Sequence, residues 1–579
     1  MDAGKRNLSD IIKQTQILEV PFYQRSYVWG KEQWERLLED AEMITLTEKE
    51  YFIGSLILKQ QLTPPGEPYK RTIIDGQQRL TTLSVFFKAL ALKTDNQRKF
   101  DNRFKLEEED TGRRMPAINH SMRDRKAFEK ILNQDEPAEI KDSEGHNNKL
   151  IHCFNFFIKN IKPERVDFDI VYSRLMFVSI DLGREEDEQQ IFDTINSLGV
   201  RLSTAELLKN YLFKEEDLSE YQELWLGIFE KDNSCIKYWE QEVTAGSYKR
   251  TLIDLFFYAL LQIKIQDKSL MVDTKDKILF SKMDRLFESY KYFSAKYKVS
   301  RDDLLRDIKS YAQTFRQVID PSIVEQPIEP NDYVNRVNNL IFGLKTTVLI
   351  PYILKVANRV ELDRDKMNDV FSIIETYIVR RIIVKASNRG YNGLFSESLL
   401  LNDVYTRKDF LEFINEKSDR DLYLPQDEEL KEAFNEAKLT NYNAKGVLYL
   451  LESKIRDANR NSNSLLSINS YSLEHLMPKK WENNWGKLDD QEQVDYRNSK
   501  LLTLGNLTII TQSLNATIRD ASWRDKLQGD TKKHGGLIAY SSGIQLFSDL
   551  IQKEKWDESA IEERANYLYE KSIEVWKAK

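Results

Sequence analysis

The sequence predicts a multidomain, predominantly helical α+β fold, and three observations support this. Residues 1–215 mix strand-like runs with helical patterns, residues 216–450 carry long amphipathic helical patterns, and residues 451–579 combine two strands with helices. The chain has 579 residues, of which 41% are hydrophobic and 31% charged. This is enough apolar material for about four domains of ~150 residues, and it excludes disordered and fibrous proteins.

The elements of the first segment follow from its apolar pattern. Short runs of β-branched and aromatic residues at 51–58, 72–74 and 175–180 predict strands. Apolar residues recur at helical spacing over 34–41 and 80–90, with charged residues opposite, and predict two helices. The first segment is therefore predicted to be an α/β domain.

Few strand signals occur between residues 216 and 450, so this middle region is predicted to be helical. A polar tract at 457–470 marks a boundary. Beyond it, residues 471–475 and 501–511 predict strands, and helices are expected to begin near Asn515 and Ser559.

Charge and cysteine content narrow the class of protein. The net charge of −7 means that a nucleic-acid site would have to be a local basic patch on an acidic chain. With only Cys153 and Cys235, a disulfide framework and a cysteine-rich zinc site are excluded, which favours a reducing cytoplasm. The N-terminal residues lack the apolar core of a secretory signal, and no apolar stretch reaches the ~20 residues of a membrane-spanning helix.

The second predicted strand ends at Asp75 and Gly76, and a helix then opens with Gln77, Gln78 and Arg79. A helix N-terminus has unpaired N–H groups and a partial positive charge, so it can receive phosphate, and Gly76 lets a ligand approach the backbone. Arg79 would add a bidentate contact to phosphate. Asp75 would hold a magnesium ion or orient a water molecule. Such polar residues have no obvious role in a core, which favours a functional interpretation.

Gln24 and Arg25 lie among aromatic residues in the segment PFYQRSYVW, just before a predicted helix. The aromatic rings would stack on a base while Arg25 reaches phosphate. An aromatic-anchored loop with a solvated arginine is the alternative, and the spacing does not choose between the two.

A third motif covers residues 191–210. Ser203 and Glu206 predict a capping box for a helix that carries Lys209, and Gly199 predicts a helix end just after Asn196. Asn196 and Lys209 would close the polar pocket. Caps and turns alone are the structural alternative.

Four separated motifs, YQRSYVW, FIGSLIL, IIDGQQRLTTL and IFDTINSLGVRLSTAELLKN, occur in this order. Together they resemble the N-terminal domain of the GmrSD-type restriction endonucleases, a ParB/sulfiredoxin-like domain. The resemblance implies binding and hydrolysis of an NTP (GTP or ATP) that drives or gates DNA cleavage. It also implies a nucleotide pocket lined by Gln24, Arg25, Asp75, Gln77, Gln78 and Arg79. The sequence departs from the family at Leu198, where arginine is common, and at Glu206, where aspartate is usual.

A second set of polar residues lies near the C-terminal end. Glu474 and His475 end one predicted strand, Asn506 precedes a second, and Asn515 opens a helix. This β-hairpin and helix suit phosphodiester hydrolysis with one divalent ion, either Mg²⁺ or Mn²⁺. His475 would be the general base, Glu474 and Asn515 the metal ligands, and Asn506 the group that orients the imidazole. A structural histidine and a routine turn asparagine are the alternatives when each residue is taken singly.

The motifs EHLMP, LGNLTIITQSLN and SWRDK resemble the HNH (His-Me finger) nuclease module, a ββα-metal fold, at the C-terminus of the same GmrSD-type enzymes. This resemblance covers about residues 445–579. TYIVRRIIVKASNRGYNGLF resembles the connecting region of that family. Basic residues that would contact phosphate, or else form solvated helix faces, are Arg380, Arg381, Lys385, Arg389, Arg519, Arg524, Lys526, Lys532 and Lys533.

The leading hypothesis is an NTP-responsive, divalent-metal-dependent DNA endonuclease of anti-phage defence that cuts modified foreign DNA, a type IV-like restriction enzyme. Its partners would be double-stranded DNA and a nucleotide, and a homo-oligomer is compatible with it. One alternative is a nucleotide-binding switch or scaffold with a weak or vestigial nuclease. Another keeps the nuclease but makes the N-terminal domain a sensor of modified DNA, with hydrolysis secondary.

Overall fold

The computed structural model describes residues 2–22, 24–64, 68–107, 114–141, 148–183, 203–213, 217–246, 248–416, 420–456, 464–530 and 534–578. Residues Met1–Cys235 form one compact unit and residues Ile236–Lys579 a second, and each is described separately. The predicted predominantly helical α+β class is confirmed. The division into three domains stays a prediction, and its boundary at residue 450 falls inside helix α24 (Asn441–Ile455).

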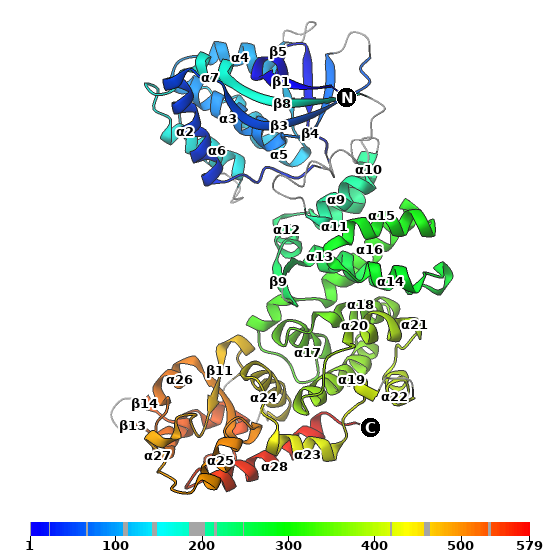
Figure 1. Cartoon of the computed structure of the whole chain (residues 1–579), viewed down its shortest axis with the longest axis vertical. Helices are drawn as coiled ribbons and strands as arrows, with labels where there is room; N and C mark the ends of the chain where they lie inside the picture. Colours follow the sequence, from blue (N-terminus) through cyan, green and yellow to red (C-terminus); the bar gives the residue numbers. More distant parts are fainter. Residues whose placement is uncertain are drawn as a thin grey trace. The chain divides into compact units, whose positions relative to one another are not determined.

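A mixed six-stranded sheet organises the N-terminal unit (Figure 1). The strand order is β1-β8-β3-β4-β2-β7, in which β3 pairs parallel with β8 and antiparallel with β4. The sheet strands are β1 (Asp2–Asn7), β2 (Gln16–Glu19), β3 (Tyr51–Gln60), β4 (Tyr69–Asp75), β7 (Ile118–Asn119) and β8 (Leu175–Leu182), and a separate pair is β5 (Lys105–Glu107) with β6 (Arg114–Pro116). The three strands predicted in this segment are all present.

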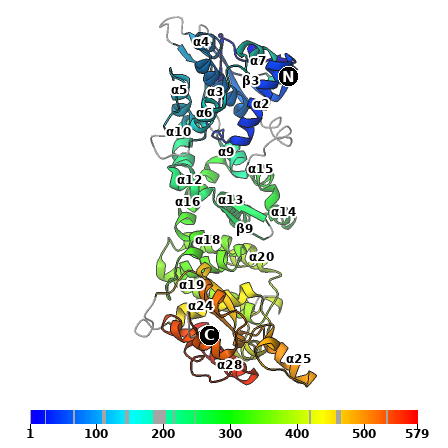
Figure 2. The same ribbon diagram turned by 90° about the vertical axis from the view of Figure 1, so that its left-hand side faces the viewer.

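Helix α3 (Gln77–Lys93) is the centre of the packing in this unit. Almost all its residues are buried, including polar ones such as Thr81, Thr82 and Lys88, so the helix is covered on every side. It packs against α4, α5, α6 and α7, and α2 packs against α6 and α7 (Figure 2). The other helices are α1 (Leu8–Ile11), α2 (Lys31–Thr47), α4 (Gln97–Phe104), α5 (Met122–Leu132), α6 (Lys149–Asn160), α7 (Phe168–Arg174), α9 (Thr204–Leu212), α10 (Leu218–Tyr221) and α11 (Gly227–Phe229).

The second unit is mostly helical. Helix α12 (Asn233–Trp239) begins before the division between the units. After it come α13 (Leu252–Lys264), α14 (Thr274–Phe280), α15 (Leu286–Tyr297), α16 (Arg301–Val318), α17 (Tyr333–Asn338), α18 (Ile350–Arg359), α19 (Arg364–Ile383), α20 (Tyr391–Gly393), α21 (Leu399–Leu401), α22 (Arg407–Glu416), α23 (Asp427–Glu436) and α24. The prediction of an all-helical middle was wrong in one place, because β9 (Glu242–Ala245) and β10 (Tyr248–Thr251) form a hairpin.

A small hairpin with flanking helices ends this unit. Its elements are β11 (Tyr471–His475), α25 (Gln491–Lys500), β12 (Leu507–Thr511), α26 (Gln512–Ile518), α27 (Trp523–Gln528), the short pair β13 (Gly529–Asp530) and β14 (His534–Gly535), and α28 (Glu558–Val575). Strand β12 is shorter than predicted, because Leu504–Asn506 form a 3₁₀ turn. Helix α24 packs against β11, β12 and α28, which joins the hairpin to the helical body (Figure 1).

Within the described ranges, every helix is too short or too polar to cross a lipid bilayer. Cys153 and Cys235 are both buried free thiols, in agreement with the prediction that they do not form a disulfide framework.

Candidate functional site

The junction between β4 and α3 has the form that the DGQQR motif predicts. Strand β4 ends at Asp75, and Gly76 has a left-handed φ of 101° before α3 begins at Gln77. A Cβ atom at Gly76 would lie 2.5 Å from Cδ1 of Leu56. Glycine is therefore required here by both the backbone conformation and the space available.

Gln77 and Gln78 have a structural role that the sequence did not reveal. Both are buried. Gln77 Nε2 donates to the carbonyl of Arg25 at 3.0 Å, while Gln78 Oε1 accepts from the N–H of Val28 at 2.8 Å and its Nε2 donates to Ser26. The two amides hold the segment before α2 against the start of α3. The expectation that they have no use in a core was wrong.

Gln24 and Arg25 are brought to the same junction by these bonds. Gln24 Nε2 donates to the carbonyl of Ile74 at 3.2 Å, and both side chains are half-buried. The predicted members of the N-terminal pocket from residues 24–25 and 75–79 therefore meet at one place, although they are far apart in the sequence.

Asp75 and Arg79 form an ion pair at this junction, with Nη2 2.8 Å from Oδ2. Arg79 Nη2 also donates to the carbonyl of Ser55 at 2.5 Å, and its Nε is buried without a hydrogen-bond partner among the described residues. The Asp75 side chain is 39% exposed, so the carboxylate is open to a ligand on one side. A guanidinium with a buried unpaired N–H beside a helix N-terminus can receive an anionic group.

Lys209 lies on α9, whose predicted capping box between Ser203 and Glu206 is present. Its side chain is buried and pairs with Glu230, with Nζ 3.2 Å from Oε1. Burial acts to raise the pKa of Glu230, but Lys209 and Arg123 outweigh it and lower that pKa. The charge of Lys209 is thus already balanced. Asn196, its predicted companion, lies outside the described residues.

The second predicted site lies on the β11–β12 hairpin. The strands are antiparallel, with Glu474 opposite Thr508 and His475 opposite Leu507. Helix α26 follows β12 directly, packs on both strands and carries Asn515. The predicted order of strand, strand and helix is present.

His475 ends β11, and its Nε2 atom is buried without a hydrogen-bond partner in the described part of the chain. Burial lowers the pKa of His475 to about 4, and the nearby charges of Lys479 and Lys526 add to this effect. The imidazole is therefore neutral at neutral pH, and the neutral ring is the form that accepts a proton.

Glu474 has a partner that the sequence did not indicate. The ammonium group of Lys526 on α27 is fully buried and pairs with the Glu474 carboxylate, and it also donates to the carbonyl of His475 at 2.8 Å. Burial raises the pKa of Glu474, while Lys526 opposes the increase. Of the two predicted metal ligands, Glu474 is thus already engaged. Asn515 is half-buried, and its side chain makes no hydrogen bond to the described residues.

Asn506 is buried and makes four side-chain hydrogen bonds. Its Oδ1 accepts from the N–H of Met477 at 2.8 Å and from Trp556 Nε1 at 3.0 Å, and its Nδ2 donates to the carbonyls of Met477 and Leu501. These bonds fix the backbone just beyond His475. The described structure shows no bond between Asn506 and the imidazole, so Asn506 acts on His475 through the chain.

The turn that carries Asn506 is held by α28. A Cβ atom at Gly505 would lie 2.2 Å from the carbonyl oxygen of Ile561, so the turn can approach the helix only with glycine there. Arg564 Nη1 donates to the carbonyls of Leu504, Gly505 and Leu507 at 3.3, 3.0 and 2.7 Å. One buried guanidinium thus fixes the entry to β12.

Arg380 and Arg381, predicted as phosphate contacts, are fully buried, and that prediction was wrong. Arg380 donates to the carbonyls of Pro425 and Trp576, and Arg381 donates to three backbone carbonyls. Lys526, also predicted to contact phosphate, is in the buried pair described above. Lys385, Arg389, Arg519 and Arg524 are exposed and remain candidates, whereas Lys532 and Lys533 lie outside the described residues.

A protein-bound metal ion is usually held by a cluster of His, Cys, Asp and Glu side chains. Among the residues that the structure describes, no group of three or more His, Cys, Asp or Glu side chains could hold a metal ion. An ion at the hairpin would therefore depend on an amide oxygen, from Asn515, as well as on a carboxylate.

Two domain families match the chain. The model of the GmrSD restriction endonuclease N-terminal domain matches residues 8–213, and that of the GmrSD restriction endonuclease C-terminal domain matches residues 424–571. No curated protein matches the chain. The first match contains the β4–α3 junction, and the second contains the β11–β12 hairpin and most of α28. The chain therefore belongs to the GmrSD restriction endonucleases, which are enzymes that cleave DNA in restriction.

Proposed function

We propose that this restriction endonuclease is a cytoplasmic, NTP-responsive and divalent-metal-dependent enzyme that cuts modified foreign DNA in anti-phage defence. The observation that carries the nuclease assignment is His475, a neutral histidine with an unpaired Nε2 at the end of the hairpin that precedes α26. A neutral ring nitrogen that bonds to no described residue is available to accept a proton from a reacting group. It supports a general base in an HNH-type site.

His475 would take a proton from the attacking water through Nε2 as the water oxygen attacks the scissile phosphorus and the bond between that phosphorus and the leaving oxygen breaks. Its position depends on the Asn506 bonds to Met477 and on the ladder between β11 and β12. Lys526 anchors the carbonyl of the same histidine. These contacts hold the imidazole without occupying its Nε2.

Glu474 and Asn515 would hold Mg²⁺ or Mn²⁺, because carboxylate and amide oxygens are ligands that these ions prefer. When bound, such an ion stabilises charge on the phosphate and on the leaving oxygen. The amide of Asn515, which makes no hydrogen bond to the described residues, fits this role. The Glu474 carboxylate fits it only if Lys526 gives up its contact.

The N-terminal unit would bind GTP or ATP at the start of α3. The backbone N–H groups after Gly76, the partly exposed Asp75 and the guanidinium of Arg79 would meet the phosphates, with Gln24 and Arg25 alongside. Gln77 and Gln78 would support this pocket by holding the neighbouring segment. Asp75 would also orient the water or the magnesium ion used in hydrolysis.

The test is cleavage of matched modified and unmodified plasmid DNA with Mg²⁺, with and without GTP or ATP. His475→Ala is expected to reduce cleavage ~10²–10⁴-fold, the usual contribution of a general base. His152→Ala, an exposed histidine of the other unit, is the matched control and should leave cleavage unchanged. Intact metal-dependent cleavage in His475→Ala would refute the assignment.

A second candidate is a nucleotide-binding switch whose nuclease is weak or vestigial. The pair between Glu474 and Lys526 favours it, since a predicted metal ligand is neutralised by a buried ammonium. Metal-dependent cleavage of plasmid DNA separates the two candidates, because a switch with a vestigial nuclease would not cut. Asp75→Ala tests the coupling: in the proposed enzyme it removes both NTP turnover and NTP-dependent cleavage, whereas lost turnover with unchanged cleavage would mean that the two sites are uncoupled.

A further inference from the structure

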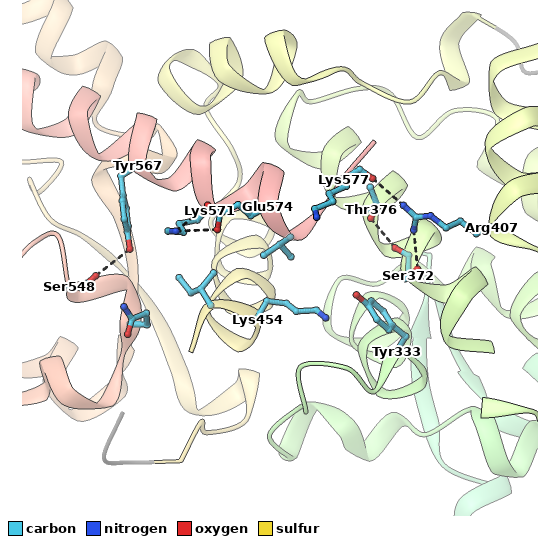
Figure 3. Close-up of a pocket in the computed structure, with 13 residues that line it drawn as sticks. Tyr333, Ser372, Thr376, Arg407, Lys454, Ser548, Tyr567, Lys571, Glu574 and Lys577 are labelled. Atoms are coloured by element: carbon cyan, nitrogen blue, oxygen red, sulfur yellow. Dashed lines mark hydrogen bonds and ion pairs between the residues drawn. The ribbon is translucent and has the colours of Figure 1, made fainter. Parts of the chain in front are cut away.

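A cavity of about 910 Å³ lies within the C-terminal unit, outside the hairpin and the β4–α3 junction. Its walls come from α17, α19, α22, α24 and α28, together with residues 545–548 and Lys577. Figure 3 shows Tyr567 and Ser548 at one end, Arg407 and Ser372 at the other, and lysine side chains between them. This volume is within the range of pockets that bind small molecules, ~300–1,000 Å³.

The lining is strongly cationic. It has four basic side chains, Arg407, Lys454, Lys571 and Lys577, and a single carboxylate, Glu574. Only Lys571 pairs with that carboxylate, at 3.1 Å. Across the described residues, the charged side-chain groups of the other three form no ion pair, although the backbone N–H of Arg407 donates to Asp369 Oδ2 at 3.0 Å.

The side chains of Lys454 and Arg407 have neutral partners. Lys454 Nζ donates to Asn331 Oδ1 at 3.0 Å and lies 4.5 Å from the centre of the Tyr333 ring. Arg407 Nη1 donates to Ser372 Oγ at 3.2 Å, and its Nη2 to the carbonyl of Lys577 at 3.5 Å. These contacts leave the positive charges unbalanced.

A buried carboxylate next to the cavity does not compensate them. Glu375 accepts two bonds of 2.6 Å from Arg336 and one of 2.7 Å from Trp576 Nε1, so its oxygens are already used. Burial, with Arg336 adding to it, lowers the pKa of Lys454 to about 8. A half-buried ammonium without a counter-charge is unfavourable, and a bound anion would offset that cost.

The donors are spread over the cavity rather than gathered at one point. Besides the cations, the hydroxyl groups of Ser372, Ser548 and Tyr567 lie on its surface, and Tyr333 and Tyr567 offer ring faces. Separated cations favour a ligand with several negative groups, and Arg with Lys and hydroxyl donors suits phosphate oxygens. A cavity walled by five helices suits a small molecule better than a DNA duplex.

We propose that this cavity binds a small polyphosphate-bearing molecule of the nucleoside di- or triphosphate class, at a site separate from the β4–α3 junction. Lys454, Lys577 and Arg407 would contact the phosphates, and a tyrosine ring would lie against the remainder. The proposal does not depend on the nucleotide site proposed for the N-terminal unit.

The test is calorimetric titration of the full chain with inorganic tripolyphosphate and with ATP at constant ionic strength. Lys454→Gln and Lys577→Ala are expected to weaken binding at this site by about tenfold or more each, since each removes a charge-assisted contact. Lys577 is exposed, so its variant should fold even if that of the half-buried Lys454 does not. Lys408→Ala, an exposed cation on the same helix as Arg407, is the matched control and should bind as the wild type does.

Arg79→Ala distinguishes the two nucleotide sites. Binding that survives Arg79→Ala but is lost in Lys577→Ala supports the cavity, whatever happens at the N-terminal junction. Binding that is lost in Arg79→Ala and unchanged in both cavity variants overturns the proposal, as does the absence of saturable binding. A short DNA duplex that displaces tripolyphosphate in wild type, but not in Lys577→Ala, would show that the cavity recognises DNA phosphates and would also overturn it.

Discussion

The buried pair of Lys526 and Glu474 gives a sharp test of how the hairpin is held. The Lys526 side chain is 0% exposed and that of Glu474 is 7% exposed. Removing one partner of a buried pair leaves the other charge buried without a counter-charge, which lowers the stability by ~3–5 kcal/mol. Lys526→Met should therefore lower the stability of the hairpin by that amount, whereas Lys526→Met combined with Glu474→Gln should recover most of it.

The pH dependence of this loss has a defined sign. Burial raises the pKa of Glu474, and removing Lys526 removes the group that opposes this. The folded variant then keeps a proton that the unfolded chain releases above a pKa of about 4.3. Since the folded state binds more protons, stability falls as pH rises, and Lys526→Met should be more destabilised at pH 8 than at pH 5.

Hydrogen exchange of the β11 and β12 amides measures the opening free energy of this region directly, without assuming that the whole chain unfolds in one step. Lys553→Met is the matched control. Its pair with Glu563 has side chains 31% and 60% exposed, and an exposed pair contributes ~0–1 kcal/mol. A loss in Lys526→Met no larger than that in the control, or a double variant no more stable than the single one, would refute the reasoning.

Three further predictions concern activity and the turns. Because the pKa of His475 is lowered to about 4, the single-turnover cleavage rate should stay level from pH 8 to 5.5. A base with the ordinary histidine pKa would lose ~tenfold in rate over this range, so an inflection near pH 6.5 would contradict the prediction. Gly76→Ala should lower the free energy of unfolding, measured in urea, by more than ~1–2 kcal/mol, because a strained φ adds to a clash with Leu56. Gly246→Ala is the control: it has open space around its Cβ position and should lose only the ~1–2 kcal/mol of the strained φ. Asn506→Ala leaves buried partners unpaired at ~1–3 kcal/mol each, so both the melting temperature and the cleavage rate should fall; a wild-type melting temperature would contradict the role of its four bonds.

Local patterns predicted much of the fold. The strands at 51–58, 72–74 and 175–180 and the helix over 80–90 appear where periodicity placed them, because each has one clear apolar face or run. The hairpin and helix around His475 were predicted for the same reason. The β9–β10 hairpin was missed, although Gly246 between two short runs is a turn signal that could have indicated it.

Side chains whose partners are distant in the sequence could not be predicted in this way. Lys526 lies 52 residues from Glu474, and two of the carbonyls that accept from Arg381 lie 40 and 42 residues away. From the sequence alone, a basic pair such as Arg380 and Arg381 is expected to be exposed to solvent. The carbonyl groups that accept from these arginines come close to them only when the helices pack. The roles of Gln77 and Gln78 were missed for the same reason.

The hydrogen bonds from Arg564 to the turn before β12 matter for the order in which this region can fold during synthesis. During synthesis, β11 and β12 leave the ribosome well before α28, yet the guanidinium that fixes their connection arrives only with that last helix. The turn before β12 is therefore held in full only after α28 has been synthesised. Under the proposed function, a polypeptide that terminates before α28 would lack the contact that fixes the hairpin carrying His475.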